Sequence, residues 1–215
     1  MYTAIELKDL TLKPKINDIT LKVLADYYGM FLNPFVYKYI VRDIKGTQNI
    51  ELRFKYENFC HLLGIENIAK YSVPYKDLHE YRGLDGWNNI YGNNASGFVL
   101  DIPLLKGINK KKFQSVKAKF VYFYLLPNLI ERPLSVRYKN ENVNPPTRID
   151  CEIMFYSMVE NDNAIIHLGI KKVEKLGYYI PKTFFVEKVS EKQDDIYLAQ
   201  QEEIETKTYT IQKRR

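Results

Sequence analysis

Apolar residues recur at a helical spacing near the start of the chain. Between residues 18 and 31 the apolar positions fall on one side of an α-helix: Ile19, Val23, Leu24, Tyr27 and Phe31. Asn17 and Asp18 are candidate caps for the first turn, and Asn33-Pro34 is a dipeptide that breaks a helix. The pattern predicts one amphipathic helix over residues 18–31.

The spacing becomes that of a strand after this helix. Residues 35–42 are rich in aromatic and β-branched side chains, and residues 50–54 alternate between apolar and polar positions. The segment between them, residues 43–49, contains Gly46 and has the composition of a turn. Together these segments predict a β-hairpin.

A short apolar stretch follows the hairpin directly. Phe59, Leu62 and Leu63 lie at helical spacing, Asn58 can cap the start, and Gly64 can supply the left-handed residue that ends a helix. His61 lies inside this stretch and is one of three histidines in the chain. Two interpretations remain open for His61: a core or surface histidine without chemistry, or a proton-transferring group at the edge of a cleft.

Residues 71–108 have a different composition, with many glycines, prolines and asparagines. This composition predicts a long irregular connector or an insertion, and a loop of that length is usually functional. The segment also contains the sole tryptophan, Trp87, and His79, which we expect to be a solvated residue.

Residues 109–130 predict a helix that carries positive charge. Its apolar side includes Phe113, Val116 and Phe120, and Pro127 should end or kink it. Five lysines crowd the other positions: Lys110, Lys111, Lys112, Lys117 and Lys119. No acidic residue lies between Asn109 and Asn128, so this face is either simply solvated or contacts phosphates.

The C-terminal part alternates in the manner of antiparallel strands. Four strands are expected, over residues 149–158, 164–172, 177–186 and 204–211. Tight connections at residues 160–163 and 172–177 suit hairpins. A turn of helix is expected around residues 196–201, and residues 213–215 are expected to form a frayed basic tail.

Alternation within these strands places polar side chains on one face. His167, Lys171, Tyr179 and Thr183 fall opposite the apolar positions, which predicts an open polar face of the sheet. Histidine can transfer a proton, lysine can neutralise a phosphate, and hydroxyls can orient it, so the face suits phosphodiester chemistry. The alternative is an exposed polar face without chemistry.

Composition excludes several classes of protein. The 215 residues are 46% hydrophobic and 27% charged, as in soluble globular proteins, and the net charge of +6 is compatible with a polyanionic partner. Cys60 and Cys151 are the only cysteines, so no disulfide framework is expected. A zinc site from these thiols with His61 and His167 lacks the usual ligand spacing. No apolar run reaches the roughly 18 residues of a membrane span, and no signal peptide is evident, so a cytosolic protein is expected.

Three short pieces of the chain resemble the phage-associated branch of the barnase–EndoU–colicin–RelE-like nucleases, in its fourth phage group. The first is Phe59-Cys60-His61-Leu62-Leu63-Gly64, which is similar to a Phe-x-His-Leu-Leu-Gly signature. The second is the aromatic helix over residues 120–126 followed by 128–132. The third combines residues 178–185, including Pro181-Lys182-Thr183-Phe184, with Asp195-Ile196-Tyr197 and Gln200.

The resemblance implies helices packed on a four-stranded antiparallel sheet. It also implies metal-independent RNA cleavage, in which the ribose 2′-hydroxyl attacks the adjacent phosphate. By position, His61 and Thr183 correspond to motif residues of the family, and Arg132 is a candidate phosphate anchor. The length of segment 71–108 and the position of Pro133 directly after Arg132 depart from the family pattern.

The resulting expectation is a single α+β domain over residues 1–215, with N-terminal helices and a β-hairpin packed on a C-terminal four-stranded antiparallel sheet. The expected function is that of a small toxin-like endoribonuclease of a phage or mobile element, acting on RNA in the host cytosol without metal, cofactor or membrane. The expected catalytic residues are His61 and Thr183. The expected nucleic-acid-binding residues are Lys110, Lys111, Lys112, Lys117, Lys119, Arg132, His167, Lys171 and Tyr179.

Two other functions remain open. A non-catalytic inhibitor or interaction protein could use the same scaffold to bind a host defence or nucleic-acid-processing protein, and segment 71–108 would suit recognition. A plain RNA- or DNA-binding module would bind with a steep salt dependence and without cleavage.

Overall fold

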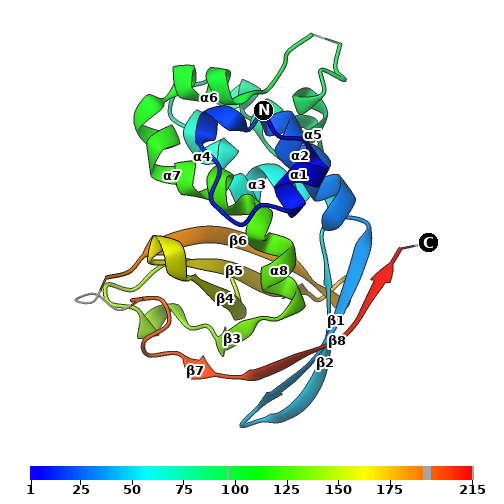
Figure 1. The fold of residues 1–215 in the computed structure, drawn as a ribbon, viewed down its shortest axis with the longest axis vertical. Coiled ribbons are helices and arrows are strands. Elements are labelled where there is room, and N and C mark those ends of the chain that lie inside the picture. Colours follow the sequence, from blue (N-terminus) through cyan, green and yellow to red (C-terminus); the bar gives the residue numbers. More distant parts are fainter. Residues whose placement is uncertain (96, 191–194, 215) are drawn as a thin grey trace. The chain divides into compact units, whose positions relative to one another are not determined.

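The computed structural model describes residues 1–95, 97–190 and 195–214 (Figure 1). The chain forms two compact units: a helical unit, Met1–Pro34 with Lys55–Tyr124, and a sheet unit, Phe35–Phe54 with Leu125–Arg215. The chain therefore leaves the helical unit for the hairpin and then returns to it. The expectation of one domain over residues 1–215 stays a prediction. Among the described residues, no helix is both long enough and apolar enough to span a bilayer.

The helical unit consists of short helices and 3₁₀ turns. Its α-helices are α1 (Ala4–Lys8), α2 (Leu21–Phe31), α3 (Phe59–Leu63), α4 (Ile65–Ala69), α5 (Gly83–Ile90), α6 (Ile102–Ile108) and α7 (Lys110–Tyr122). Its core is aromatic: the Phe59 ring centroid lies 5.3 Å from those of Tyr28 and Trp87 and 5.6 Å from that of Phe123. Buried aromatic rings in such edge-to-face contacts contribute beyond the area they bury.

The helix expected over residues 18–31 is present as α2, but its cap differs. The Thr20 side chain accepts a hydrogen bond from the backbone N–H of Val23 at 3.1 Å. Asn17 and Asp18 belong instead to a 3₁₀ turn, Ile16–Asp18. A threonine at this position satisfies one of the unpaired N–H groups of the first turn.

Residues 71–108, expected to be a long irregular connector or an insertion, contain more regular structure than their composition suggests. The segment contains a 3₁₀ helix (Tyr75–Tyr81) as well as α5 and α6. Glycines punctuate the segment: Gly83, Gly92 and Gly97 have positive φ values of 57°, 67° and 68°. A right-handed helix does not continue through a positive φ, so the chain forms short helices instead of one long helix. The side chain of Asp101 caps α6 by accepting from the N–H of Leu104.

The helix expected over residues 109–130 divides into two. α7 ends at Tyr122, and α8 (Leu126–Glu131) begins in the sheet unit with Pro127 in its first turn. A proline lacks the N–H that a continuous helix would need at this position, whereas the first turn of a new helix tolerates it.

The sheet is larger than expected. Its described strands are β1 (Phe35–Asp43), β2 (Gly46–Arg53), β3 (Leu134–Arg137), β4 (Ile153–Val159), β5 (Ala164–Val173), β6 (Tyr178–Lys188), β7 (Glu202–Glu203) and β8 (Glu205–Lys213). They form one eight-stranded sheet in the order β7-β3-β4-β5-β6-β2-β1-β8. The four-stranded C-terminal sheet is therefore wrong in detail: the hairpin β1–β2 joins the sheet, and β3 and β7 are too short to show an alternating pattern.

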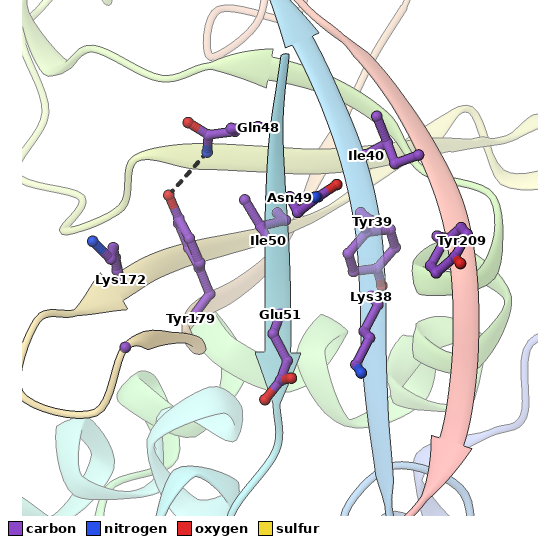
Figure 2. A pocket seen from close by; sticks show the side chains of 11 residues that line it. Lys38, Tyr39, Ile40, Gln48, Asn49, Ile50, Glu51, Lys172, Tyr179 and Tyr209 are labelled. Atoms are coloured by element: carbon purple, nitrogen blue, oxygen red, sulfur yellow. Dashed lines mark hydrogen bonds between the residues drawn. The ribbon is translucent and has the colours of Figure 1, made fainter.

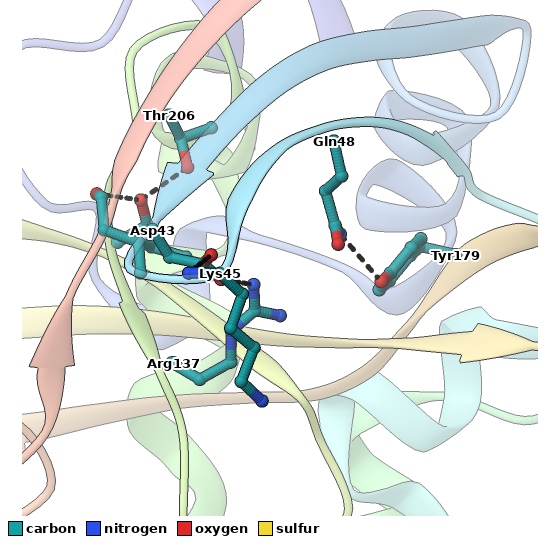
Figure 3. A network of polar contacts seen from close by, with 8 residues as sticks. Asp43, Lys45, Gln48, Arg137, Tyr179 and Thr206 are labelled. Carbon is teal, nitrogen blue, oxygen red and sulfur yellow. Dashed lines mark hydrogen bonds and ion pairs between the residues drawn. The ribbon is translucent and has the colours of Figure 1, made fainter.

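The sheet curls, and the curl joins strands that are distant in the sheet order. β7 pairs with β3, β8 pairs with β1, and only Ile204 separates β7 from β8. The hydroxyl of Ser135 on β3 donates to that of Thr206 on β8 at 2.7 Å, and Arg137 forms an ion pair with Asp43 (Figure 3). One C-terminal segment therefore bridges the two ends of the sheet.

The basic C-terminal tail is more ordered than expected up to Arg214. β8 continues to Lys213, and the Arg214 guanidinium donates to the backbone carbonyl of Phe54 at 2.6 Å. Arg215 lies outside the described residues. Residues 196–200 form turns, and the backbone N–H of Ala199 donates to the carbonyl of Asp195 at 3.1 Å, so a single helical turn is present where one was expected.

Candidate functional site

The His61 stretch folds as the sequence predicts, with one difference. Phe59, Leu62 and Leu63 are buried, and Gly64 ends α3 with a φ of 72°. The Asn58 side chain does not cap α3, because it accepts a hydrogen bond from the backbone N–H of Lys55 at 3.0 Å. Burial of the apolar stripe leaves His61 exposed on the opposite side of the helix.

Lys119 from α7 lies against the glycine that ends the His61 helix. A Cβ atom added to Gly64 would lie 3.7 Å from Lys119 Nζ and 3.3 Å from Val116 Cγ1. Burial disfavours the charged ammonium and lowers the pKa of Lys119 to about 8. The structure thus places one of the expected nucleic-acid-binding lysines beside the His61 motif. Its lowered pKa lets the ammonium lose a proton closer to neutral pH than an exposed lysine does.

The first three lysines of α7 form an exposed basic surface. Lys110, Lys111 and Lys112 are exposed, and none of them is ion-paired with a carboxylate in the part of the chain that the structure describes. The ammonium groups of Lys112 and Lys70 each lie 5.6 Å from the ring centroid of Tyr71, which is 72% exposed. Aromatic rings beside cations are typical of surfaces that bind single-stranded nucleic acid.

His79 and Cys60 of the helical unit and Cys151 of the sheet unit are the next residues that could take part in chemistry. His79 is exposed and its Nδ1 lies 2.8 Å from the carbonyl oxygen of Lys76. Burial raises the pKa of Cys60 and of Cys151 to about 12, so both thiols stay protonated. Among the described residues, no three His, Cys, Asp or Glu side chains lie together in a group that could hold a metal ion.

The open polar face expected in the sheet unit is wrong for His167. In the pairing of β5 with β6, His167 lies opposite Phe185 and Gly169 lies opposite Thr183. His167 is fully buried, because it stacks on Phe185 and because Asp195 and Tyr197 cover it. The face is closed by the turn that follows Asp195, which no local pattern in β5 indicates.

The expectation is also wrong for Tyr179. The register of β5 and β6 shifts between Gly169 and Ile170, so that Lys172 lies opposite Tyr179. Side chains alternate along a strand, and this bulge therefore moves Tyr179 to the face opposite that of Thr183. Tyr179 is buried and its hydroxyl accepts a hydrogen bond from the Gln48 amide at 3.3 Å.

Three further residues of the expected site belong to the sheet unit: Lys171, Arg132 and Thr183. Lys171 Nζ lies 2.5 Å from Asp150 Oδ1, and Lys182 lies 3.2 Å from the other oxygen of the same carboxylate. Arg132 is exposed and has no ion pair among the described residues. Thr183 is half-buried against Gly169 and Cys151. His61 belongs to the helical unit, and Thr183 belongs to the sheet unit.

The sheet unit contains a pocket of about 650 Å³ (Figure 2). Residues from five strands and one turn line it: Lys38, Tyr39, Ile40, Gln48, Asn49, Ile50, Glu51, Lys172, Gly177, Tyr179 and Tyr209. Ligand pockets in proteins have volumes in this range. Of the residues expected to bind nucleic acid, Tyr179 alone lines it.

Sequence reasoning missed the other residues of this pocket. The hairpin register places Lys38 opposite Glu51 and Ile40 opposite Asn49, and this much can be read from the turn. The approach of β6 and β8 to the same hairpin cannot be predicted from the turn, because these strands lie more than 100 residues away in the sequence.

A comparison with models of protein families matches residues 20–215 to the family described as phage-Barnase-EndoU-ColicinE5/D-RelE like nuclease 4. No curated protein and no solved structure matches the chain. The matched region contains both His61 and Thr183 and agrees with the resemblance inferred from the short motifs.

Proposed function

The chain belongs to the phage-Barnase-EndoU-ColicinE5/D-RelE like nuclease 4 family, and we propose that it is an endoribonuclease that cleaves RNA without a metal ion. The observation that carries this proposal is the family match over residues 20–215. It is supported by the exposed His61 in its motif helix and by the basic surface of α7. The substrate would be met in the host cytosol.

The proposed reaction needs two proton transfers. A base removes the proton of the ribose 2′-hydroxyl, the 2′-oxygen forms a bond to phosphorus, and the bond from phosphorus to the 5′-oxygen breaks. An acid then protonates the 5′-oxygen that leaves. The products are a 2′,3′-cyclic phosphate and a 5′-hydroxyl.

His61 is the proposed acid or base. Imidazole exchanges protons near neutral pH, and the position of His61 on the exposed side of α3 keeps it accessible to RNA. Lys119 is a proposed partner on the same unit, since its lowered pKa of about 8 lets it hold or release a proton near the motif glycine.

The developing charge on the phosphate needs donors. Thr183 is the proposed hydroxyl donor, and Arg132 is the proposed cation, because its guanidinium is exposed and unpaired among the described residues. Lys171 suits this role less well, since Asp150 already neutralises it.

The experiment incubates purified protein with tRNA, rRNA and mRNA in EDTA and in magnesium. Cleavage in both conditions is expected, together with its loss in His61→Ala and its retention in His79→Ala. His79 is a matched control, because it is an exposed histidine in the same unit. Intact RNA in all conditions, together with an equally harmless wild type and His61→Ala in cells, contradicts the proposal.

A second candidate function is supported by the exposed apolar residues of segment 71–108. Tyr71, Tyr75, Leu84 and Val99 are 72%, 85%, 49% and 50% exposed. Such residues suit a non-catalytic protein that binds a host defence or nucleic-acid-processing protein. A pull-down from host lysate that yields one stoichiometric protein partner, lost in a Tyr71→Ser/Tyr75→Ser variant, would favour this function over cleavage.

A further inference from the structure

The pocket in the sheet unit forms where two neighbouring strands separate. β2 pairs with β1 along its whole length, but it pairs with β6 in parallel at one position only, Leu52 opposite Tyr179. Beyond this position a side-chain hydrogen bond from Gln48 to the Tyr179 hydroxyl replaces the ladder (Figures 2 and 3). The opening is therefore part of the sheet, held by a specific polar contact.

The charges around the pocket leave a cation without a partner. Lys38 lies opposite Glu51 in the hairpin, yet Glu51 Oε1 lies 2.5 Å from Arg53 Nε. Lys38 consequently has no ion pair within the described ranges. Lys172 adds a second ammonium at the other side of the opening, where it contacts Glu174 at 3.0 Å. The one carboxylate that lines the pocket is neutralised, so the pocket attracts anions.

The uncharged polar groups of the pocket can also bind a ligand. The Tyr179 hydroxyl accepts from Gln48, so its own hydrogen remains for a ligand oxygen. Burial raises the pKa of Tyr179, which keeps this hydrogen in place. The Asn49 amide is exposed and makes no hydrogen bond in the part of the chain described. An amide offers both a donor and an acceptor, as the edge of a nucleobase does.

Tyr209 supplies an aromatic surface at the rim. The register of β1 and β8 passes from Tyr39 opposite Thr208 to Lys38 opposite Thr210, so Tyr209 is the extra residue of a β-bulge. Its side chain is 70% exposed and stands beside Lys38 and Tyr39 in Figure 2. A bulge re-aims a side chain at the cost of local pairing, and an exposed ring is a stacking partner for any base.

We propose that this pocket binds one nucleotide unit of single-stranded RNA, with the base against Tyr209 and the phosphate oxygens at Lys38 and the Tyr179 hydroxyl. The choice of RNA rests on the proposed function. The pocket would select which nucleotide of the chain is held by the sheet unit.

The experiment measures binding of a fluorescein-labelled single-stranded RNA to the His61→Ala protein, which removes the proposed acid or base. Tyr209→Ala is expected to weaken binding by about 5- to 150-fold, the range for loss of one stacked base. Tyr179→Phe, which deletes only the hydroxyl, and Lys38→Ala are each expected to weaken it by about 3- to 10-fold. Tyr75→Ala and Lys45→Ala are the matched controls, because they remove an exposed tyrosine and an exposed lysine outside the pocket.

Competition identifies the ligand. Uridine and adenosine monophosphates should displace the labelled RNA from the His61→Ala parent and lose this ability with Tyr209→Ala. Displacement by polyglutamate that is equally strong with and without Tyr209 would overturn the proposal. Binding by all three pocket variants that equals binding by the controls would also overturn it.

The outcome is separable from that of the proposed function. If the wild-type protein does not cleave RNA but binds it in a way that depends on Tyr209, the nuclease function fails and the pocket proposal stands. If the wild-type protein cleaves RNA but the pocket variants bind RNA as tightly as their parent, the nuclease function stands and the pocket proposal fails.

Discussion

The Nε2 atom of His167 lies 2.6 Å from the Oδ2 atom of Asp195, and both side chains are buried. The imidazole ring stacks on Phe185 with a centroid distance of 4.3 Å, and Tyr197 meets it edge-on at 5.9 Å. These contacts hold the turn that begins at Asp195 against β5 and β6. The sequence suggests His167 as a nucleic-acid-binding residue on an open polar face, whereas in this structure its contacts hold one segment against the sheet.

Asp195→Ala is expected to lower the free energy of unfolding by about 3 kcal/mol, because it leaves a buried imidazole without its partner. Chemical denaturation measures the loss. Asp150→Ala is the control, since its ion pairs with Lys171 and Lys182 are exposed, and it should change stability little.

The double variant His167→Leu/Asp195→Leu should recover much of this loss, because replacing both buried polar partners by apolar side chains removes the unpaired group. A double variant that is less stable than Asp195→Ala alone would contradict the view that the pair acts mainly through its mutual contact.

Lys119 predicts a pH dependence of stability with a defined sign. Its pKa is about 8 when folded and 10.5 ordinarily, so between these values the unfolded chain binds a proton that the folded chain has lost. The free energy of unfolding should therefore rise by about 1 to 3 kcal/mol from pH 8 to pH 10.5 through this residue. Lys119→Met should be more stable than wild type at pH 7 and should flatten the rise.

Lys117→Met is the control for this prediction, because Lys117 is a half-buried lysine of the same helix. Identical pH profiles for Lys119→Met and the wild type would show that burial does not disfavour the Lys119 ammonium.

The basic surface of α7 predicts a salt-dependent contribution to RNA binding. Replacing Lys110, Lys111 and Lys112 together by alanine should reduce the slope of log affinity against log salt by about 2, since each phosphate contact on a single strand contributes about 0.7. The slope is obtained by measuring the affinity for single-stranded RNA at salt concentrations between about 50 and 300 mM. An unchanged slope would assign these lysines to an ordinary solvated face.

Gly169 tests the packing around Thr183. A Cβ atom at Gly169 would lie 2.6 Å from Thr183 Cγ2 and 2.8 Å from Cys151 Cβ. Gly169→Ala should therefore lower the free energy of unfolding by about 1 to 3 kcal/mol and displace Thr183. Gly107→Ala is the matched control: outside its chain neighbours and the backbone of its own helix, no described atom lies within 4 Å of the added Cβ, and alanine in α6 should stabilise by about 0.5 to 1 kcal/mol. Equal thermal unfolding of the two variants would contradict this packing.

Local patterns predicted the elements that depend on their own residues. Helix α2 and the helix that carries His61 follow from apolar spacing and from a terminating Gly64, and the hairpin β1–β2 follows from alternation around a turn. The strands β5 and β6 were also predictable, because each is long and flanked by turn residues.

Features that depend on distant residues were not predictable. The face on which Tyr179 lies depends on a one-residue bulge at Gly169, and the burial of His167 depends on a turn that begins 28 residues later at Asp195. The pocket depends on where β6 and β8 meet the hairpin. Periodicity within a strand does not specify any of these partners.

The central claim is cleavage of RNA by attack of its own 2′-hydroxyl, and analysis of the product ends tests it most directly. The measurement uses an RNA oligonucleotide and a copy with a 2′-deoxyribose at the cleaved position, both incubated with the protein in EDTA and analysed by mass spectrometry. The account predicts a 2′,3′-cyclic phosphate and a 5′-hydroxyl from the RNA, no cleavage of the deoxy copy, and no product with His61→Ala. Cleavage of the deoxy copy, or full activity of His61→Ala, would contradict it.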